Sequence, residues 1–383
     1  MTGAAAYITR AAAFLPNQPV GNERIEQVLG QVGARPSRAR AIVLRSNGIR
    51  QRHYVIDPAS GAITHNNAQL TAAAVRGLLQ PGFALDDIEV LACGTSSPDQ
   101  IAPNHAVMVH GELRNPPCEV MAAAGICVSG VMALKYGYMS VLAGLSKNAV
   151  TTGSETASLA MRAHNFSAEN DARVAAMEKN PGLAFEKDFL RWMLSDGAGA
   201  LLLQHRPNPQ GLSLRIEWID QFSYANEQQV CMYAGAEKHA DGSLIGWRQV
   251  EPQALLDRSV LTLKQDVRLL DSGIRDATRK GFDALRKRRR LGAGDVDWFL
   301  PHYSSEYFRS VLYEVMPEEV RIPYERWFTN LTTKGNVGAA SMYLMIEELF
   351  SSGRLRPGER ILCYVPESGR FSTAFVYLTV TTA

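Results

Sequence analysis

Residues Val128–Leu142 are apolar on nearly every side, and this run limits the fold more than any other feature of the sequence. It reads VSGVMALKYGYMSVL, with Lys135 as its single charged residue. A helix without a polar face has to be covered by protein on all sides. The run therefore predicts a buried helix, and a chain of 383 residues is long enough to bury a large core around it.

Strand-like and helix-like segments alternate along the rest of the chain, which indicates an α/β fold. Helical spacing predicts two further helices, over residues 261–285 and 338–350. The Ala-rich amino terminus lacks a basic start and is interrupted by Arg10, so we expect a first strand there and no signal peptide. The other predicted strands cover residues 88–94, 118–124, 148–153, 197–204, 212–219 and 296–300, and residues 360–365 and 372–380 are expected to form a hairpin.

Both halves of the chain show the order strand, reactive-looking residue, helix, although no residue-level repeat is visible. The turn-rich stretch at residues 205–211 (HRPNPQG) is the best boundary between them. We therefore predict an amino-terminal half over residues 1–206 and a carboxy-terminal half over residues 207–383. The polar stretch 157–190 has no clean strand, so we expect it to cover the site or a subunit interface.

The balance of charge and the cysteine pattern exclude several classes of protein. Forty basic and 38 acidic side chains leave a net charge of +2, too little to favour nucleic acid as a partner. Five scattered cysteines without a CxxC pair fit a reducing compartment, so we expect a cytoplasmic protein. We expect no membrane span, because no uncharged apolar run reaches about 18 residues. We also expect no metal site, because His105 and His110 lack partners at ligand spacing.

Cys127 is the first candidate for chemistry, because it stands between an apolar strand and the apolar helix. The first N–H groups of a helix are unpaired and carry partial positive charge, which favours a thiolate or an anion beside them. Such a thiol can accept an acyl group from a thioester. Taken alone, Cys127 is better explained as a small buried apolar residue, as free cysteines often are.

His302 and Asn336 are the next candidates. His302 follows Pro301 at the carboxyl end of a predicted strand, where α/β sheets usually place their sites. Asn336 lies in a glycine-bracketed turn that enters a helix. Each has a plain alternative: a histidine satisfied at a strand end, and an asparagine that caps a helix or forms a turn.

The three residues make chemical sense as a set. Carbon–carbon bond formation by decarboxylation needs a covalently held acyl group. It also needs two hydrogen-bond donors for the thioester oxygen of the second substrate, where enolate charge develops. A neutral histidine and an asparagine amide supply such donors.

The segments that carry these residues resemble those of β-ketoacyl-acyl-carrier-protein synthase III enzymes. GICVSGVMAL resembles their nucleophile segment, FLPHYSSEYFRSV their Pro-His segment, and KGNVGAASMYLMIEEL their Gly-Asn segment. Weaker similarities in the same order are NGIRQRH, TTGSETAS, SDGAGALLL and RLRPGERILCYVPESGRF, so the resemblance covers nearly the whole chain.

The resemblance implies a thiolase fold, with two related α/β halves in five αβαβα layers and a tight homodimer. It implies that Cys127 is acylated and that His302 and Asn336 assist decarboxylation. It also implies an oxyanion hole made by the N–H groups of Cys127 and Gly369. Side chains flank Gly369 where the housekeeping enzymes are mostly glycine, namely Glu367, Ser368 and Arg370. That departure indicates a specialised relative, and LRWMLSDGAGA with PESGRF is most similar to the dialkylresorcinol-type ketosynthases.

Basic residues suggest where the substrate is delivered. The run Arg286–Arg290 is either a solvated helix end or a docking site for an acidic carrier protein or coenzyme A phosphates, with Arg286, Lys287 and Arg288 as its candidates. Arg50 and Arg52 fall in a segment that in relatives lies near the pantetheine entrance, so they are secondary candidates.

The leading functional hypothesis is Claisen condensation of a Cys127-bound acyl group with a malonyl- or β-ketoacyl-thioester, in fatty-acid-like or polyketide biosynthesis. The alternatives are a same-fold acyltransferase that forms an ester or amide, and a non-catalytic partner subunit. We expect no tightly bound cofactor, with coenzyme A or acyl-carrier-protein thioesters as substrates. The sequence leaves open the acyl chain and the thioester that delivers it.

Overall fold

A mixed sheet of nine strands runs through the protein, in a computed structural model that describes residues 5–32, 40–166 and 189–383. The strand order is β13-β14-β15-β8-β1-β7-β6-β4-β5. The strands are β1 (Tyr7–Phe14), β4 (Val90–Thr95), β5 (Glu119–Ala124), β6 (Asn148–Glu155), β7 (Gly197–Gln204), β8 (Ser213–Ser223), β13 (Trp298–Pro301), β14 (Arg360–Glu367) and β15 (Ser372–Thr381). Each predicted strand is therefore present, including the hairpin β14–β15. Most of the predicted cover at residues 157–190 lies outside the described residues.

The two ends of this sheet repeat one pattern of strand directions. In the first half β4 is parallel to β5 and β6, β6 is antiparallel to β7, and β7 is antiparallel to β1. In the second half β13 is parallel to β14, β14 is antiparallel to β15, and β15 is antiparallel to β8. A parallel bridge from Phe299 to Trp327 occupies the place that β5 has in the first half. The division predicted at residues 206 and 207 falls in the connection between β7 and β8.

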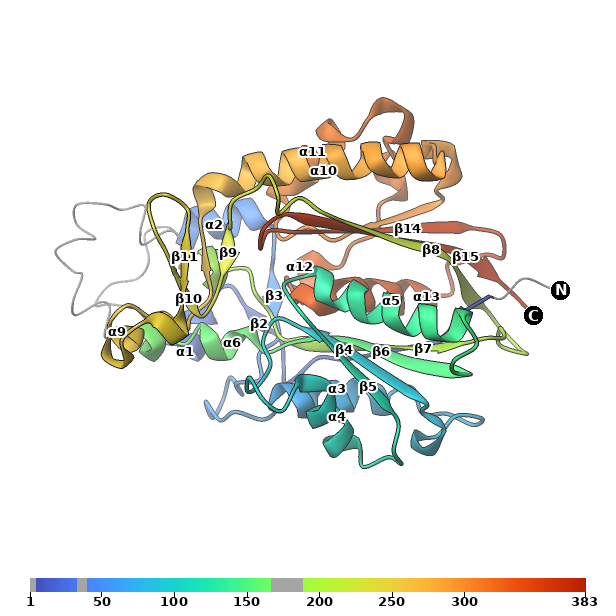
Figure 1. The fold of residues 1–383 in the computed structure, drawn as a ribbon, viewed down its shortest axis with the longest axis horizontal. Coiled ribbons are helices and arrows are strands. Elements are labelled where there is room, and N and C mark those ends of the chain that lie inside the picture. Colours follow the sequence, from blue (N-terminus) through green and yellow to red (C-terminus); the bar gives the residue numbers. More distant parts are fainter. Residues whose placement is uncertain (1–4, 33–39, 167–188) are drawn as a thin grey trace.

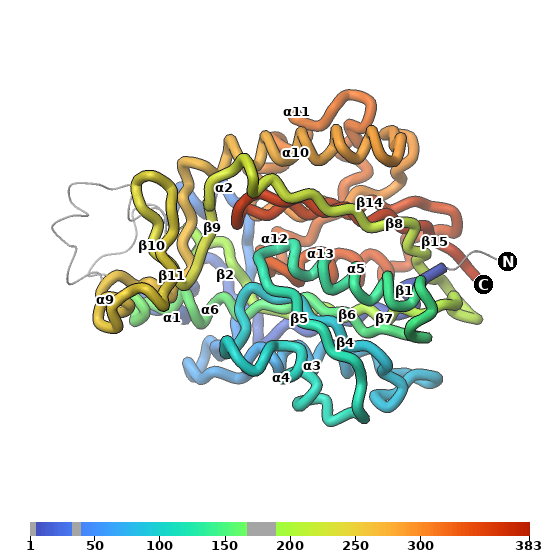
Figure 2. The backbone as a smooth tube through the Cα atoms, viewed as in Figure 1, coloured from blue at the N-terminus to red at the C-terminus, as the bar shows by residue number. Residues whose placement is uncertain are grey.

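The halves are stacked, which produces five layers (Figures 1 and 2). Helices α3 (Asn67–Arg76) and α4 (His105–Leu113) cover the outer face of the first half. Helices α10 (Val267–Arg289) and α11 (Tyr307–Val315) cover the outer face of the second half. The central layer contains α5 (Val128–Leu142) and α13 (Ser341–Ser351), one helix from each half. The arrangement is the predicted αβαβα thiolase fold.

Helix α5 spans the run that the sequence analysis singled out. It packs on β4 and β6 of its own half and on β14 and β15 of the other, so most of its side chains are buried. In the single chain one edge of the helix is not covered, because Met132 and Met139 are 38% and 48% exposed there. Helical periodicity identified the element but contained no information about which side would remain at the surface.

Two predicted helices begin later than expected. Residues 264–265 form a short strand, β12 (Lys264–Gln265), paired with β9 (Met232–Tyr233), so α10 begins only at Val267. The Asp266 side chain caps α10 by accepting the Arg268 N–H at 3.3 Å. The segment after Asn336 starts as a 3₁₀ turn, η7 (Gly338–Ala340), before α13 continues as a regular helix.

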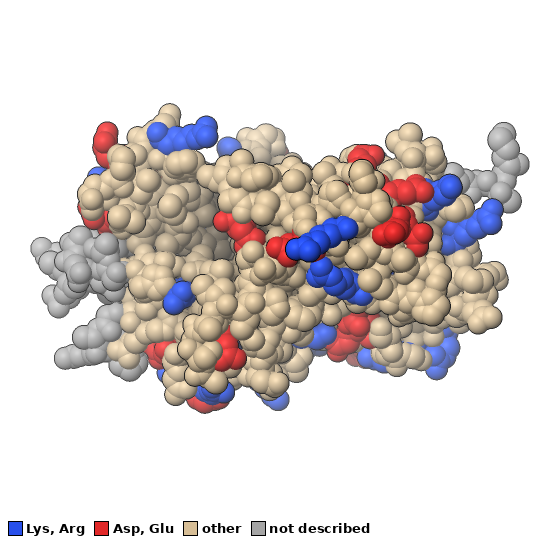
Figure 3. All heavy atoms as spheres, turned by 90° about the horizontal axis from the view of Figure 1, so that it is seen from below, with Lys and Arg blue, Asp and Glu red and all other residues tan. Residues whose placement is uncertain are grey.

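Neither the helices of the described residues nor the face formed by α3 and α4 indicates a membrane or a nucleic acid as a partner. Within residues 5–32, 40–166 and 189–383, no helix combines the length and the apolar character that crossing a bilayer requires. Seen from the side of α3 and α4, the positive and negative side chains are interspersed and sparse, without a continuous basic surface on this face (Figure 3).

Candidate active site

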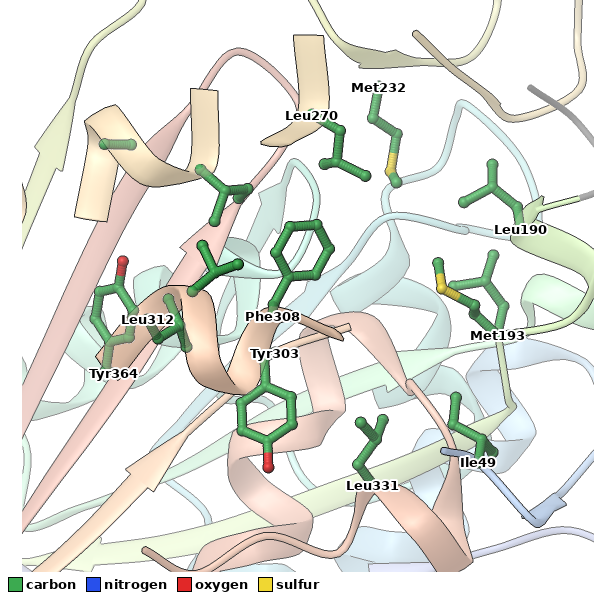
Figure 4. Packing of buried hydrophobic residues seen from close by; sticks show 14 of the residues in the cluster. Ile49, Leu190, Met193, Met232, Leu270, Tyr303, Phe308, Leu312, Leu331 and Tyr364 are labelled. Atoms are coloured by element: carbon green, nitrogen blue, oxygen red, sulfur yellow. The ribbon is translucent and has the colours of Figure 1, made fainter. Parts of the chain in front are cut away.

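Cys127, His302 and Asn336 line one pocket between the two halves, as the sequence hypothesis required of them. Most of the remaining wall is apolar, and Figure 4 shows several of these side chains facing a common space. The apolar lining consists of Met193, Met232, Leu270, Ile274, Phe308 and Leu312. The pocket thus brings the three candidate residues together beside a largely hydrophobic wall.

Cys127 occupies the N-cap position of α5. Strand β5 leads to it through Gly125, whose φ of 154° favours glycine at the turn. Burial raises the pKa of the Cys127 thiol, and the nearby carboxyl groups of Glu367 and Glu155 raise it further. The resting form is therefore the thiol, which must lose its proton as the sulfur attacks a carbonyl.

His302 follows β13 directly, and its backbone N–H donates to the carbonyl of Tyr364 on β14 at 2.8 Å. The residue is 4% exposed. Burial lowers the pKa of His302 to about 4, because the charged imidazolium loses its hydration. The ring is therefore neutral near pH 7, with one nitrogen able to donate a hydrogen bond and one able to accept.

Asn336 lies between the short helix α12 (Leu331–Lys334) and η7. Its Oδ1 accepts the Gly338 N–H at 3.0 Å. A backbone N–H can only donate, so this contact fixes the orientation of the amide and leaves its NH₂ group for other partners. The residue is 4% exposed and lines the pocket, so that group is placed to donate to a bound ligand.

Glu155, at the end of β6, supports the Asn336 loop and was not anticipated from the sequence. It is 2% exposed, and its Oε1 accepts the N–H groups of Ser96 at 3.1 Å and Ala339 at 3.2 Å. Its Oε2 accepts the hydroxyls of Ser96 at 2.7 Å and Ser97 at 2.6 Å. The carboxylate thus ties the end of β4 to the turn after Asn336. The TTGSETAS segment was the available signal, but nothing in it identified Glu155 as the anchor.

The loop after β14 reaches the pocket with other residues than expected. Ser368 and Pro366 line the pocket, whereas Gly369 is not among the lining residues. Gly369 packs instead against Ile126, where an added Cβ would lie 3.1 Å from Ile126 Cγ1. Ser368 thus forms part of the pocket wall, and the oxyanion role of Gly369 stays a prediction.

The expectation that Arg52 binds substrate is wrong for a physical reason. The residue is 0% exposed, and its guanidinium donates to the carbonyl of Trp192 at 2.6 and 3.2 Å and to Asn22 Oδ1 at 2.6 Å. All of these contacts are within the protein, and the buried guanidinium is closed to a ligand in solution. Arg50 is exposed, so its role near an entrance stays a prediction.

The basic run lies in the last turn of α10. Arg286 pairs with Glu319 at 2.6 Å, and Arg288 pairs with the buried Asp220 at 3.3 Å. Ile274, on the same helix, lines the pocket, and a helical rise of 1.5 Å per residue separates it from Lys287 by about 20 Å. The run is thus remote from the pocket along the helix, and docking by Arg286, Lys287 and Arg288 stays a prediction.

Comparison with known proteins yields one consistent family. A family model described as the C-terminal part of 3-oxoacyl-[acyl-carrier-protein] synthase III matches residues 287–377. The chain is 26% identical over 316 residues to a β-ketoacyl-[acyl-carrier-protein] synthase III of Deinococcus radiodurans, covering 82% of this chain and 79% of that protein. This relative is a ketosynthase III by its description.

Solved structures share the fold of this chain. The chain superposes on AbyA1, described as a tetronic acid condensing enzyme, with a TM-score of 0.74 and 19% identity, covering 98% of this chain and 99% of that one. It superposes on Xanthomonas campestris OleA, solved with bound lauric acid and lauroyl-CoA, with a TM-score of 0.71 and 17% identity, covering 98% and 99%. At these identities the superpositions establish the thiolase fold.

Proposed function

This chain is a β-ketoacyl-acyl-carrier-protein synthase III-like condensing enzyme, and we propose that it performs a Claisen condensation at Cys127. The observation that carries the proposal is the meeting of Cys127, His302 and Asn336 in one apolar-walled pocket. A nucleophile alone would serve simple acyl transfer. The additional pair of hydrogen-bond donors is what a developing enolate needs.

In the first half-reaction the Cys127 sulfur attacks the carbonyl of an acyl thioester. The pKa of the thiol is raised, so its proton has to leave during the attack, and the neutral His302 ring in the same pocket is the proposed acceptor. The tetrahedral intermediate collapses with release of the donor thiol, which takes up a proton. The product is an acyl group in thioester linkage to Cys127.

In the second half-reaction a malonyl- or β-ketoacyl-thioester binds with its thioester oxygen facing His302 and the Asn336 amide. Loss of carbon dioxide, or transfer of a proton to the ring nitrogen of His302 that is not donating, leaves an enolate at the carbon next to the thioester carbonyl, and these donors stabilise its charge. The enolate carbon attacks the Cys127-bound carbonyl, and the Cys127 sulfur leaves as a thiolate that takes up a proton and restores the thiol. Nucleophile, base and donors are all side chains of this protein, so the proposed steps use no bound cofactor.

We further propose that the enzyme is cytoplasmic and acts in specialised metabolism. Its substrates would be delivered as thioesters of coenzyme A or of an acyl carrier protein. Support comes from the Ser368 side chain in the pocket wall, where housekeeping relatives are mostly glycine. We propose polyketide-like products of the alkylresorcinol type as the product class. This assignment rests on the resemblance of the segments around residues 190–200 and 366–371.

We also propose a homodimer built on the edge strand β5. Ala122 and Ala124 of this strand are exposed, and an unpaired strand edge invites pairing with another chain. The helices that pack beside β5 expose apolar side chains too, with Val107 on α4 at 41% and Met139 on α5 at 48%. Light scattering that gives the mass of a monomer would contradict this proposal.

The test of the condensation is intact-protein mass spectrometry with a panel of acyl- and β-ketoacyl-coenzyme A donors. Wild-type protein should gain the mass of the acyl group, and Cys127→Ala should gain nothing. Acylated wild-type protein should then lose that mass when malonyl thioester is added, with appearance of a β-ketoacyl product. Labelling that persists in Cys127→Ala, or acyl release only to oxygen and nitrogen acceptors, would overturn the proposal.

A further inference from the structure

Gln265, a residue of the pocket wall, has an unpaired amide oxygen. The residue lines the pocket and is 2% exposed. Its Nε2 donates to Ser368 Oγ at 3.0 Å, while its buried Oε1 has no hydrogen-bond partner within the described residues. A buried amide oxygen without a partner is unfavourable by itself, so its persistence here indicates an absent partner.

The backbone holds Gln265 firmly in this position. Gln265 lies opposite Met232 in the pairing of β12 with β9. Met232 in turn donates its N–H to the Ser368 carbonyl at 2.9 Å. The next residue, Asp266, caps α10 and binds Lys238 Nζ at 2.8 Å. Three neighbouring segments thus fix the amide at the pocket wall.

The surroundings limit what the missing partner can be. Met193, Met232, Leu270 and Ile274 line the same pocket and offer no hydrogen-bonding group beyond weak sulfur acceptors. The polar residues of the lining, which include His302, Ser304 and Asn336, do not bond to Gln265 Oε1 in the structure. A molecule that enters the pocket can supply the missing partner. A hydroxyl group satisfies the amide in either of its two orientations, because a hydroxyl both donates and accepts.

We propose that Gln265 selects acyl groups that carry a hydroxyl, either an alcohol or the enol of a keto group. The proposal deepens the proposed function and rests on it, because the acyl group it concerns is the one held near Cys127. Gln265 is a binding residue in this role and takes no part in the bond-forming steps. A site built to hydrogen-bond such a group disfavours the analogue that lacks it.

The experiment compares matched thioesters in the Cys127→Ala background, where binding is measured without reaction. Octanoyl-coenzyme A is titrated beside its 3-, 5- and 7-hydroxy derivatives by calorimetry. We expect at least one hydroxylated ligand to bind about tenfold more tightly than the plain one. Adding Gln265→Leu should bring this ratio to about one, whereas adding Gln253→Leu, a change at an exposed glutamine of α9 (Pro252–Asp257), should leave it unchanged.

Equal binding of all four ligands to the Cys127→Ala protein would overturn the inference, and so would a preference that survives Gln265→Leu. If Gln265→Leu does not fold, the comparison of ligands in the Cys127→Ala background decides alone. The proposed function is tested separately, by acylation of the wild-type protein. A hydroxyl preference in binding without any acylation would contradict the function and leave this inference standing.

Discussion

The backbone of Asn336 pairs with that of Leu194 in a parallel bridge, which attaches this residue of the second half to the first. The Asn336 N–H donates to the Met193 carbonyl at 3.1 Å, and the Asn336 carbonyl accepts the Ser195 N–H at 2.9 Å. Met193 also lines the pocket. The position of the Asn336 amide is therefore set by the half that supplies Cys127.

Asn336→Ala should separate the two half-reactions. Its amide is proposed to act on the enolate, so condensation should fall about 10²- to 10³-fold. Acylation of Cys127 should change by no more than about threefold, because that step does not use the amide. Single-turnover measurement of each step checks this. An equal loss in both would mean that Asn336 has only a structural role.

Gly153→Ala should reduce condensation without touching the pocket. An added Cβ would lie 2.3 Å from the Ala339 carbonyl oxygen, so the turn that follows Asn336 would have to move. We expect at least a tenfold lower condensation rate, since misplaced donors stabilise the enolate poorly. Gly111→Ala on α4 is the matched control, because its added Cβ meets nothing within 4 Å. A Gly153→Ala enzyme as active as this control would show that the turn tolerates displacement.

His302 should make the fold sensitive to mild acid. Burial lowers its folded pKa to about 4, against about 6.5 in an unfolded chain, so the unfolded state binds more protons between these values. The contribution of His302 to the free energy of unfolding is fully present above pH 6.5 and decreases as the pH falls toward 4. The loss between pH 7 and pH 5 is about 2 kcal/mol.

Urea unfolding of the wild type and His302→Gln at pH 7 and pH 5 measures this contribution. The free energy of unfolding of the wild type should be lower at pH 5 than at pH 7, and in His302→Gln this decrease should be smaller by about 2 kcal/mol. The exposed His205 provides the control substitution, His205→Gln, which should retain the wild-type difference. An unchanged difference in His302→Gln would mean that the imidazole is not desolvated.

Arg52→Met and Arg50→Ala should have opposite consequences. Arg52→Met removes the buried bonds to the Trp192 carbonyl and to Asn22, and should destabilise the fold by about 2–4 kcal/mol. Arg50→Ala should leave stability within about 0.5 kcal/mol, since the side chain is exposed, and should raise KM for the thioester donor. Thermal unfolding and steady-state kinetics on both variants check this. A destabilised Arg50→Ala protein would contradict the exposed, ligand-binding role of Arg50. A stable Arg52→Met protein would contradict the structural role of Arg52.

Charge reversal at the end of α10 tests the docking of a carrier protein. Changing Arg286, Lys287 and Arg288 to Glu should raise KM for a carrier-protein substrate several-fold at low salt, and the effect should shrink as salt rises. KM for the coenzyme A form of the same substrate is the internal control. No change with the carrier protein would identify the run as a solvated helix end.

The sequence predicted the strands and the central helix, and it singled out Cys127, His302 and Asn336, which line one pocket. Local patterns sufficed for these: an apolar run identified α5, and strand ends marked Cys127 and His302. Arg52 was misassigned because an arginine with a structural role looks the same in sequence as one that binds a ligand. Only its contacts with Trp192 and Asn22 distinguish the two.

Glu155 and Gln265 were missed for a related reason. Glu155 acts through bonds to Ser96, Ser97 and Ala339, which come from distant parts of the chain. Gln265 lies in a segment that helical spacing assigned to a longer α10, and its pairing with β9 depends on long-range contacts. Roles of this kind depend on tertiary neighbours, so periodicity and spacing do not reveal them.

The lining of the pocket is divided unequally between the halves. Among the residues that the structure describes, the first half contributes Cys127 and Met193 to the wall, and the other lining residues come after position 207. The nucleophile and most of the described wall are thus encoded on opposite sides of the connection between β7 and β8. We expect a chimera that joins this first half to the second half of a relative to keep the nucleophile while most of this described wall comes from the relative.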